Sequence, residues 1–215
     1  MEVFISGTSQ GIGRAIAHKF LTKGHDVVGF DVREATILHP RYRHRRTDIR
    51  AARRQEADHP QILVCNAGTL DEEHAIEVNL IGTMDFAEQF VPCTSLRSIL
   101  FIASASARNG AEFPRYAASK AGIVGYMKNL ALNVASRGIT CNSISPGGVV
   151  TPANDHILQS EDLYAQVKAE TLLGKWAEAH EIADLAYYLT VPNKSITGED
   201  VLIDYGEMLK SNFIW

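Results

Sequence analysis

Tyr116 and Lys120, in the run Tyr-Ala-Ala-Ser-Lys, are the residues of this sequence best suited to acid–base chemistry. On a helix their spacing places both side chains on one face, one turn apart. A free phenol has a pKa of about 10 and is a poor base at neutral pH. An ammonium group about 4 Å away favours the phenolate by up to roughly 4 kcal/mol at an effective dielectric of about 20. The pair therefore predicts proton transfer to or from an alcohol, although an ordinary surface Tyr and Lys would show the same spacing.

Ser104 ends the apolar run 98–104, which predicts a buried strand. In a parallel α/β sheet ligands bind at the carboxyl ends of the strands, so Ser104 is expected at that edge. Its hydroxyl could polarise a carbonyl of the same substrate. Pro114 suits the first turn of the helix that carries the Tyr/Lys pair and is expected to end near Gly138.

The segment 3–24 predicts a strand, a glycine-rich turn and a helix in direct succession. The turn runs from Gly7 to Gly13 as Gly-Thr-Ser-Gln-Gly-Ile-Gly, and Gly24 ends the helix. Glycines permit a tight turn and a close backbone approach, while the helix N-terminus offers N–H groups and a positive dipole end to a pyrophosphate. The order of elements favours a nucleotide site over an ordinary turn.

Asp31 ends the second predicted strand, 26–31, about 20 residues after the glycines. An acid at this point is placed to hydrogen-bond both hydroxyls of an adenosine ribose and to repel a 2′-phosphate. Asp31 therefore favours NAD over NADP. An Asp that merely caps a turn is the alternative, and nearby Arg33 is the main observation in favour of NADP.

The basic run 41–46, Arg-Tyr-Arg-His-Arg-Arg, has two interpretations. It could form a patch for nucleic acid or a 2′-phosphate. We favour an outer edge strand, because edge strands carry charge that resists pairing between molecules. The polar segment 50–58 that follows is expected to form a short helix.

Asn66-Ala67-Gly68 follows the next strand and is small enough to form a wall against a flat ligand. The segment 71–91 is expected to be helical with an interruption around Asn79, a polar residue in an apolar run. Because an unpaired buried amide is costly, we expect backbone, water or a functional relay to satisfy Asn79.

The rest of the chain continues the alternation of strands and helices. A strand over 139–145 leads into the loop 146–151, and a last strand spans 200–204. The mixed polar and apolar segment 152–176 is expected to form a substrate lid, with a surface helical hairpin as the alternative. About seven strands alternate with helices, which predicts one α/β domain over 1–215 with a doubly wound parallel sheet and helices on both faces.

Composition excludes several classes of protein. The 215 residues carry a net charge of −4 and are 46% hydrophobic, which fits one packed domain and not a nucleic-acid binder. Cys65, Cys93 and Cys141 have the spacing of neither a metal site nor a disulfide framework. We see no signal peptide and no apolar stretch of about 18 residues, so we expect a cytoplasmic protein outside the membrane.

Taken in order, these motifs resemble the short-chain dehydrogenase/reductase family over nearly the whole chain. The matching pieces are Ser6 to Gly13, Asn66-Ala67-Gly68, Val78-Asn79-Leu80, Ser104, Tyr116 to Lys120, Ser145-Pro146-Gly147 with Thr151, and Ile196-Thr197-Gly198. The resemblance implies a Rossmann-type sheet in the order 3-2-1-4-5-6-7 and hydride transfer between a nicotinamide and an alcohol or carbonyl carbon. It also implies a homodimer or homotetramer.

The resemblance also implies roles for single residues. Tyr116 would be the acid/base, Lys120 would lower its pKa and hold the nicotinamide ribose, Ser104 would polarise the carbonyl, and Asn79 would anchor a water in a proton relay. Asp48, with Ile49 beside it, matches the position next to adenine, and Val149 and Thr151 match positions next to the carboxamide. The full set of implied cofactor contacts is Gly7, Ser9, Gln10, Gly11, Ile12, Gly13, Asp31, Asp48, Ile49, Asn66, Ala67, Gly68, Tyr116, Lys120, Pro146, Gly147, Val149 and Thr151.

The sequence departs from the family pattern in places. The link from Ser104 to Tyr116 is about one residue shorter than usual, which makes Ser106 an alternative to Ser104. The segments 49–60 and 69–78 are also shorter than usual. We expect an NAD(H)-dependent oxidoreductase for a secondary alcohol or ketone, with no metal. The alternatives are an NADPH-dependent 3-oxoacyl-type reductase and a non-catalytic nucleotide-sensing protein on the same fold.

Overall fold

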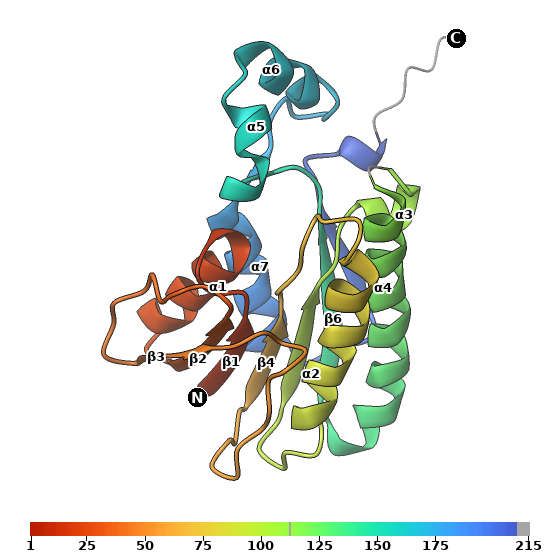
Figure 1. The fold of residues 1–215 in the computed structure, drawn as a ribbon. Helices are drawn as coiled ribbons and strands as arrows, with labels where there is room; N and C mark the ends of the chain where they lie inside the picture. Colours follow the sequence, from red (N-terminus) through yellow and green to blue (C-terminus); the bar gives the residue numbers. More distant parts are fainter. Residues whose placement is uncertain (112, 210–215) are drawn as a thin grey trace.

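Seven parallel strands form the central sheet of the protein in a computed structural model that describes residues 1–111 and 113–209 (Figure 1). The strands are β1 (Glu2–Ser6), β2 (Asp26–Asp31), β3 (Tyr42–Arg46), β4 (Ile62–Cys65), β5 (Ser98–Ile102), β6 (Thr140–Pro146) and β9 (Asp200–Ile203). Their order is β3-β2-β1-β4-β5-β6-β9. This confirms the predicted doubly wound sheet and its strand order. The last six residues of the expected domain, 210–215, lie outside the described residues.

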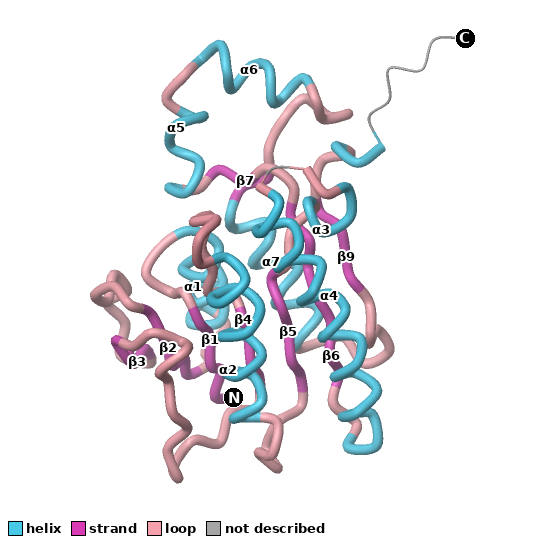
Figure 2. The backbone as a smooth tube through the Cα atoms, turned by 45° about the vertical axis from the view of Figure 1, so that its right-hand side comes forward, coloured by secondary structure: helices cyan, strands magenta, loops and turns pink. Residues whose placement is uncertain are grey.

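Helices cover both faces of the sheet (Figures 1 and 2). On one face α1 (Gly11–Thr22) and α7 (Ala179–Thr190) pack over a core that includes Val3 and Ile5 of β1. On the other face α2 (Thr83–Phe90) and α4 (Pro114–Val134) pack over Phe4. Because side chains alternate along β1, this one strand supplies both cores. The Tyr/Lys helix is therefore packed on the sheet through its part from Ile123 to Val134.

The edge strand β3 behaves as its charge pattern predicts. Arg43 forms an ion pair with Glu2, and Arg46 forms one with Glu34. Arg45 forms the most buried of these pairs, with both of its terminal nitrogens on the Asp58 carboxylate. The arginines of this run are thus engaged within the chain, which agrees with the edge-strand interpretation.

One helix prediction is wrong and another is wrong in its start. The segment 50–58 contains turns and irregular backbone but no helix, because its polar run offers no apolar stripe to bury and only Ala52 and Asp58 are buried. The helix expected over 71–91 begins later, as the π-helix η1 (Ile76–Gly82) that continues into α2. The expected interruption around Asn79 is confirmed as this π-helix, a form often found at functional sites.

The segment 152–176 leaves the body of the domain and returns to the same place. It departs after β7 (Val149–Val150) and rejoins at β8 (Ala177–Glu178), and these two strands pair in parallel. Between them lie η3 (Pro152–Asn154), α5 (Asp155–Leu158) and α6 (Glu161–Ala169), which contain no buried residue. Figure 1 shows α5 and α6 standing clear of the sheet. The remaining short elements are α3 (Ser106–Asn109), η2 (Ala135–Arg137) and η4 (Glu207–Leu209).

Candidate active site

The glycine-rich turn between β1 and α1 needs glycine for two separate reasons. Gly7 and Gly11 have φ angles of 76° and 55°, in the left-handed region that is unfavourable for other residues. Gly13 instead provides space, since a Cβ there would lie 2.0 Å from the Gly7 carbonyl oxygen and 2.4 Å from Asn66 Nδ2. The turn is therefore pressed onto the end of β4. The first turn of α1 has unpaired N–H groups beside it, which is a setting for an anionic ligand.

Ser6 and Asn66 join the ends of β1 and β4. The Ser6 hydroxyl accepts hydrogen bonds from the backbone N–H groups of Asn66 at 3.0 Å and Ala67 at 3.1 Å. The Asn66 side-chain amide donates in return to the carbonyls of Ser6 at 3.0 Å and Gly7 at 3.1 Å. These four bonds fix the floor of the turn without any ligand. Because the two N–H groups need only a hydroxyl oxygen as acceptor, the serine at position 6 can make the same bonds as a threonine would.

Asp31 is held by two backbone donors at the end of β2. Its Oδ2 accepts from the Ser9 N–H at 2.8 Å, and its Oδ1 accepts from the Arg33 N–H at 2.9 Å. The Arg33 guanidinium donates to the Gln10 side-chain carbonyl. Asp31 is therefore oriented by the turn itself, and both carboxylate oxygens keep a lone pair for a further donor.

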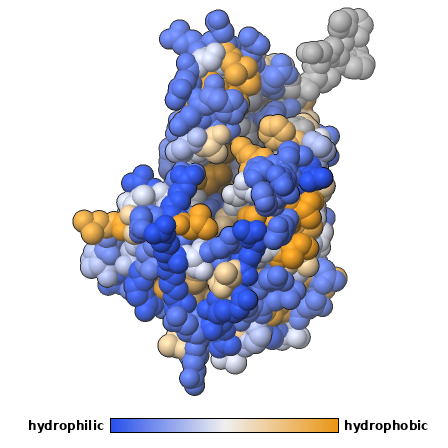
Figure 3. Space-filling model, viewed as in Figure 1, coloured by the Kyte–Doolittle hydropathy of each residue, from blue (hydrophilic) through white to orange (hydrophobic). Residues whose placement is uncertain are grey.

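A cleft of about 450 Å³ runs along the carboxyl ends of β1, β2 and β4. Figure 3 shows the molecule hollowed below α5 and α6. Eleven of the predicted contacts border the cleft: Gly7, Gln10, Gly11, Ile12, Asp31, Asp48, Ile49, Asn66, Ala67, Gly68 and Thr151. The other predicted residues do not border it: Ser9, Gly13, Asn79, Ser104, Tyr116, Lys120, Pro146, Gly147 and Val149. The cleft thus joins the glycine-rich turn, Asp31 and the Asp48 region in one continuous space.

Eight residues of the cleft wall lie outside the predicted set of cofactor contacts, although the sequence already drew attention to Arg33 as a candidate for a 2′-phosphate and to Val78 in the motif around Asn79: Phe30, Val32, Arg33, Thr47, Thr69, Val78, Pro152 and Ala153. Each of them lies within two positions of a residue that was predicted. Extending each motif by two places along its strand end would have found them. The signal was therefore present, but motif matching stopped at the family's most recognisable positions.

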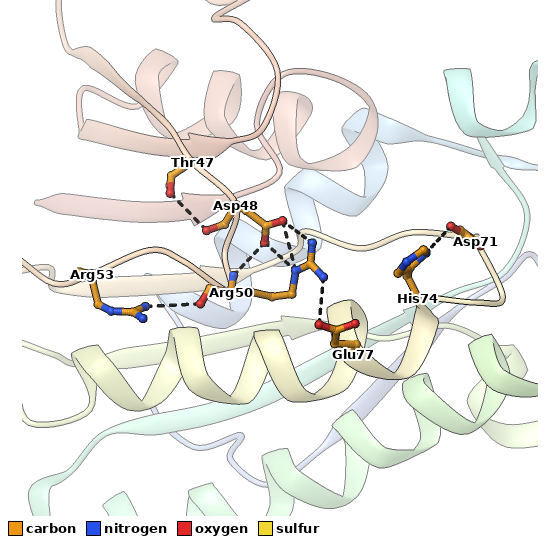
Figure 4. A network of polar contacts seen from close by, with 7 residues as sticks. All are labelled: Thr47, Asp48, Arg50, Arg53, Asp71, His74 and Glu77. Atoms are coloured by element: carbon orange, nitrogen blue, oxygen red, sulfur yellow. Dashed lines mark hydrogen bonds and ion pairs between the residues drawn. The ribbon is translucent and has the colours of Figure 1, made fainter.

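Asp48 is engaged by Arg50 at the rim of the cleft (Figure 4). Its carboxylate accepts from the Arg50 backbone N–H at 2.9 Å and from guanidinium Nη2 at 2.7 Å. Hydrogen bonding to this guanidinium lowers the pKa of Asp48. Arg50 also reaches Glu77 of η1 at 3.1 Å, and Gly82 leaves room for its stem. Arg50 therefore connects the segment 49–60, through Asp48 and Glu77, to the helix η1.

Tyr116 and Lys120 lie on α4 as predicted, with Lys120 Nζ 5.7 Å from the centre of the Tyr116 ring. Lys120 is only 6% exposed, and its Nζ donates to the Ile102 carbonyl at the end of β5 at 2.9 Å. Burial lowers the pKa of Lys120 to about 8. A charged group is thus held in a dry place between the helix and a strand end.

Ser104 and Ser106 follow β5 and are hydrogen-bonded to each other. The Ser104 hydroxyl oxygen accepts from the Ser106 hydroxyl at 2.7 Å and from the Ser106 N–H at 3.2 Å. Both serines are buried. Because Lys120 bonds to Ile102, two residues before Ser104, the Lys120 ammonium lies at the end of β5 from which Ser104 follows, and the Tyr116 ring is 5.7 Å from that ammonium. Ser104 keeps its own hydroxyl proton to donate in this arrangement.

Asn79 confirms the expectation that its amide needs partners. Its Oδ1 accepts from the Thr69 N–H at 2.7 Å, and its Nδ2 donates to the Thr69 carbonyl at 2.9 Å and to Ser119 Oγ at 3.2 Å. Ser119 in turn donates to the Tyr116 carbonyl at 2.7 Å. A Cβ on Gly68 would lie 3.0 Å from Asn79 Oδ1 and 3.6 Å from Lys120 Nζ. Gly68, which borders the cleft, therefore lies next to the side chains of Asn79 and Lys120.

The loop after β6 closes the far side of the site. The Pro146 carbonyl accepts from the Ala105 N–H at 2.7 Å, which joins this loop to the segment that follows Ser104. Val149 is buried in β7, while Thr151 borders the cleft opposite Gly11. Gly147 and Pro146 thus act at the junction of β6 with the Ser104 segment.

Other kinds of site receive no support from the part of the chain that the structure describes. No three His, Cys, Asp or Glu side chains there gather as they would around a metal ion. Cys65, Cys93 and Cys141 are buried free thiols. No helix over residues 1–111 and 113–209 has the length and apolar character to cross a membrane.

Comparisons with known proteins agree with this geometry. The family model described as enoyl-(acyl carrier protein) reductase matches residues 51–207. The 3-oxoacyl-(acyl-carrier-protein) reductase of Escherichia coli (strain K12) is 30% identical, in an alignment that covers 94% of this chain and 95% of that protein. Glucose 1-dehydrogenase of Gluconobacter oxydans is 27% identical, in an alignment that covers 99% of this chain and 93% of that protein.

Two solved structures have the same fold. The ligand-free aldohexose dehydrogenase of Thermoplasma acidophilum superposes with a TM-score of 0.88 at 23% identity, covering 100% of this chain and 96% of that one. A 4-hydroxyisoleucine dehydrogenase complexed with NADH gives 0.86 at 25% identity, with 98% and 99% covered. The chain therefore belongs to the short-chain dehydrogenase/reductase family, and it is an oxidoreductase that acts on CH–OH groups.

Proposed function

We propose that the protein interconverts a secondary alcohol and a ketone with NAD(H), and that Tyr116 is its acid/base. The observation that carries this proposal is the burial of Lys120 beside the Tyr116 ring and against the end of β5. Burying an ammonium is unfavourable, and Lys120 forms no ion pair within the described chain. Such a group is a candidate for a functional role because the fold gains no stability from its charge.

The three side chains would divide the work. In alcohol oxidation the Tyr116 phenolate takes the hydroxyl proton, and the Lys120 ammonium stabilises that phenolate. The Ser104 hydroxyl donates a hydrogen bond to the oxygen as it becomes a carbonyl. In the reverse direction Tyr116 returns the proton. The pKa of Lys120, lowered by burial to about 8, still leaves it mostly charged at pH 7, as this role requires.

The residues around the cleft fit a nicotinamide dinucleotide. Gly7 and Gly13 keep the turn free of side chains, and the start of α1 supplies N–H groups for a pyrophosphate. The adenosine would lie between Asp31 and the region of Asp48 and Ile49, which borders the same cleft. When bound, the nicotinamide supplies or accepts the hydride.

NAD(H) is favoured over NADP(H) by the setting of Asp31. Two backbone N–H groups hold its carboxylate at the cleft wall, where it would accept bonds from ribose hydroxyls and repel a phosphate. Arg43, Arg45 and Arg46 already pair with acidic side chains, so a 2′-phosphate would have to compete with those partners for them.

The segment 152–176 is proposed as the substrate lid. Its two ends meet at the paired strands β7 and β8, and its helices bury no residue against the body. A segment anchored in this way is able to move as a unit over a ligand. Its surface does not specify a substrate class beyond a small alcohol or ketone. The expected homodimer or homotetramer also remains a prediction, which mass measurement in solution tests.

Replacing Tyr116 with Phe tests the catalytic assignment. A panel of aldoses, hydroxy acids and 3-hydroxyacyl thioesters is first screened with the wild type by NADH absorbance. On any substrate found, Tyr116→Phe is expected to lose at least about 100-fold in kcat. Its Kd for NADH should stay within about twofold, because the change removes one hydroxyl and leaves the residues that border the cleft unchanged.

Tyr126→Phe is the matched control, because Tyr126 is also on α4 but its ring packs on Phe101 in the core. It should keep near-wild-type turnover. Near-normal activity of Tyr116→Phe would overturn the acid/base assignment. NADH binding without turnover by the wild type on every substrate class would leave the proposed reaction unsupported.

Direct titration with the two cofactors tests the Asp31 argument. We expect NADH to bind at least about tenfold more tightly than NADPH. Asp31→Ser should narrow that ratio because it removes the repelling charge. Tighter binding of NADPH by the wild type would contradict the assignment.

The NADPH-dependent 3-oxoacyl-type reductase is the second candidate, and Arg33 is the observation that favours it. Arg33 borders the cleft two residues after Asp31, where a 2′-phosphate would need a cation. The relative that reduces 3-oxoacyl-(acyl-carrier-protein) is also among the proteins at 30% identity. Faster turnover of 3-oxoacyl thioesters with NADPH than of any alcohol with NAD would select this candidate.

A further inference from the structure

The first turn of α4 has an unusual cap. Phe113 is the N-cap residue and has no side-chain acceptor, while Pro114 has no N–H to satisfy. The next two backbone donors, on Arg115 and Tyr116, both bond to the carboxylate of Glu72. The distances are 3.1 Å to Arg115 N and 2.9 Å to Tyr116 N, with one carboxylate oxygen for each. Glu72 is thus a bidentate cap from a distant part of the chain.

A carboxylate is well suited to this place. The N-terminus of a helix carries unsatisfied N–H groups and the positive end of the helix dipole. Charge-assisted bonds to backbone N–H groups are short and strong compared with neutral ones. A carboxylate that grips both donors fixes the direction of the first turn, and one of those donors belongs to Tyr116 itself. The position of the Tyr116 backbone therefore depends on Glu72.

Glu72 is itself held by a series of local hydrogen bonds. The Thr69 backbone is bound through its N–H and carbonyl to Asn79, and Thr69 Oγ1 accepts from the Asp71 N–H at 3.0 Å. Asp71 then accepts from the Glu73 N–H at 3.0 Å and pairs with His74 at 2.7 Å, as Figure 4 shows for the last pair. The turn that presents Glu72 is therefore tied to Asn79.

We propose that Glu72 is a positioning residue for Tyr116: by holding the first turn of α4, it sets where the phenol lies relative to the Lys120 ammonium. The proposal rests on the proposed function, since it takes Tyr116 as the acid/base. Asn79 is connected to Tyr116 by a second route: its side-chain amide donates to the Ser119 hydroxyl, which donates to the Tyr116 carbonyl. The Tyr116 peptide is thus held at its N–H by Glu72 and at its carbonyl by Ser119. The shortened segment 69–78 serves as the support of the catalytic helix.

Glu72→Ala tests this role by two measurements. With the substrate found in the panel above, kcat should fall about tenfold, while the Kd for NADH stays within about twofold. Hydrogen exchange of the peptide that spans 113–120 should become faster, because the Arg115 and Tyr116 amides lose their acceptor. The second measurement needs neither substrate nor cofactor. Glu72→Gln keeps one acceptor oxygen and should recover part of both effects.

Glu178→Ala is the matched control. Glu178 forms a capping box at the start of α7, so its loss removes a carboxylate helix cap from a helix that carries none of the proposed catalytic residues. Both variants should lose a similar amount of stability, about 1 kcal/mol, and only Glu72→Ala should lose kcat. Glu73→Ala, at the exposed neighbouring residue, should change neither.

The outcomes separate the two proposals. If Tyr116→Phe retains activity, the proposed function fails whatever Glu72 does. If Tyr116→Phe is inactive but Glu72→Ala has normal kcat or unchanged exchange over 113–120, only the positioning role of Glu72 is overturned. A fall in kcat that is equal in Glu72→Ala and Glu178→Ala would assign the effect to stability and would also overturn it.

Discussion

The two sides of the site are built in opposite ways. On the cofactor side Ser6, Asn66 and Asp31 hold the glycine-rich turn with hydrogen bonds that need no ligand. On the lid side α5 and α6 bury no residue, and Leu172 and Leu173 are more than half exposed, at 54% and 67%. The cofactor side is held in place by the protein's own hydrogen bonds, while the lid side exposes apolar side chains to solvent.

This difference shows that the chain preorganises the cleft and does not preorganise α5 and α6. A preorganised cleft does not lose conformational entropy when its ligand binds, so rigidity there adds to affinity. A lid must open and close, so its local stability has to be low. Its root is nevertheless well packed, since Trp176 is buried and the Tyr164 ring contacts it with centroids 5.8 Å apart. Mobility is therefore expected in α5 and α6 and not at β7 and β8.

The largest expected effect comes from filling the cofactor side. In Gly13→Ala the new Cβ would lie 2.0 Å from a backbone oxygen, so the turn must move. We expect a loss of about 3 kcal/mol in the free energy of unfolding and at least about a tenfold weaker NADH affinity. Urea denaturation and NADH titration measure the two effects.

Gly125→Ala is its matched control, because a Cβ at Gly125 meets no atom within 4 Å. Replacing a glycine within α4 should raise stability by about 0.5–1 kcal/mol. Equal destabilisation by both substitutions would contradict the tight fit of the turn.

Much of the cofactor side was predictable from the sequence, because its signals are local. The apolar runs gave the strands, and the glycine spacing predicted the turn between β1 and α1. The helix expected over 50–58 was wrong: the lack of an apolar stripe was visible in the sequence, whereas the burial of Asp58 against Arg45 was not. The Glu72 cap and the β7–β8 pair were not predictable, because each joins residues that are distant in sequence.

The next largest effect concerns Lys120, which lies between the two sides. Burial lowers its pKa from 10.5 to about 8, so folding disfavours its charged form. Lys120→Met should remove activity but raise the free energy of unfolding by about 2 kcal/mol at pH 7, after loss of the bond to Ile102. Urea denaturation of the wild type and the variant measures this gain.

The gain from Lys120→Met should depend on pH in a defined direction. Between pH 8 and 10.5 the unfolded wild type binds more protons at Lys120 than the folded protein, so wild-type stability rises with pH there. The difference in the free energy of unfolding between Lys120→Met and the wild type is therefore largest below pH 8 and decreases as the pH approaches 10.5. A variant that is less stable than the wild type at pH 7 would show that the charge is paired in solution.

The smallest effect on stability should come from the lid. Leu163 lies on α6 and is 36% exposed, so Leu163→Asn is expected to change the free energy of unfolding by no more than about 0.5 kcal/mol. Leu100→Asn, in the fully buried β5, should instead lose several kcal/mol, about 3 or more, in the free energy of unfolding.

If the lid closes over an apolar part of the substrate, Leu163→Asn should raise KM with little change in the Kd for NADH. A destabilisation of Leu163→Asn comparable to that of Leu100→Asn would mean that α6 packs against the body in solution. The contrast between a fixed cofactor side and a mobile lid would then be wrong.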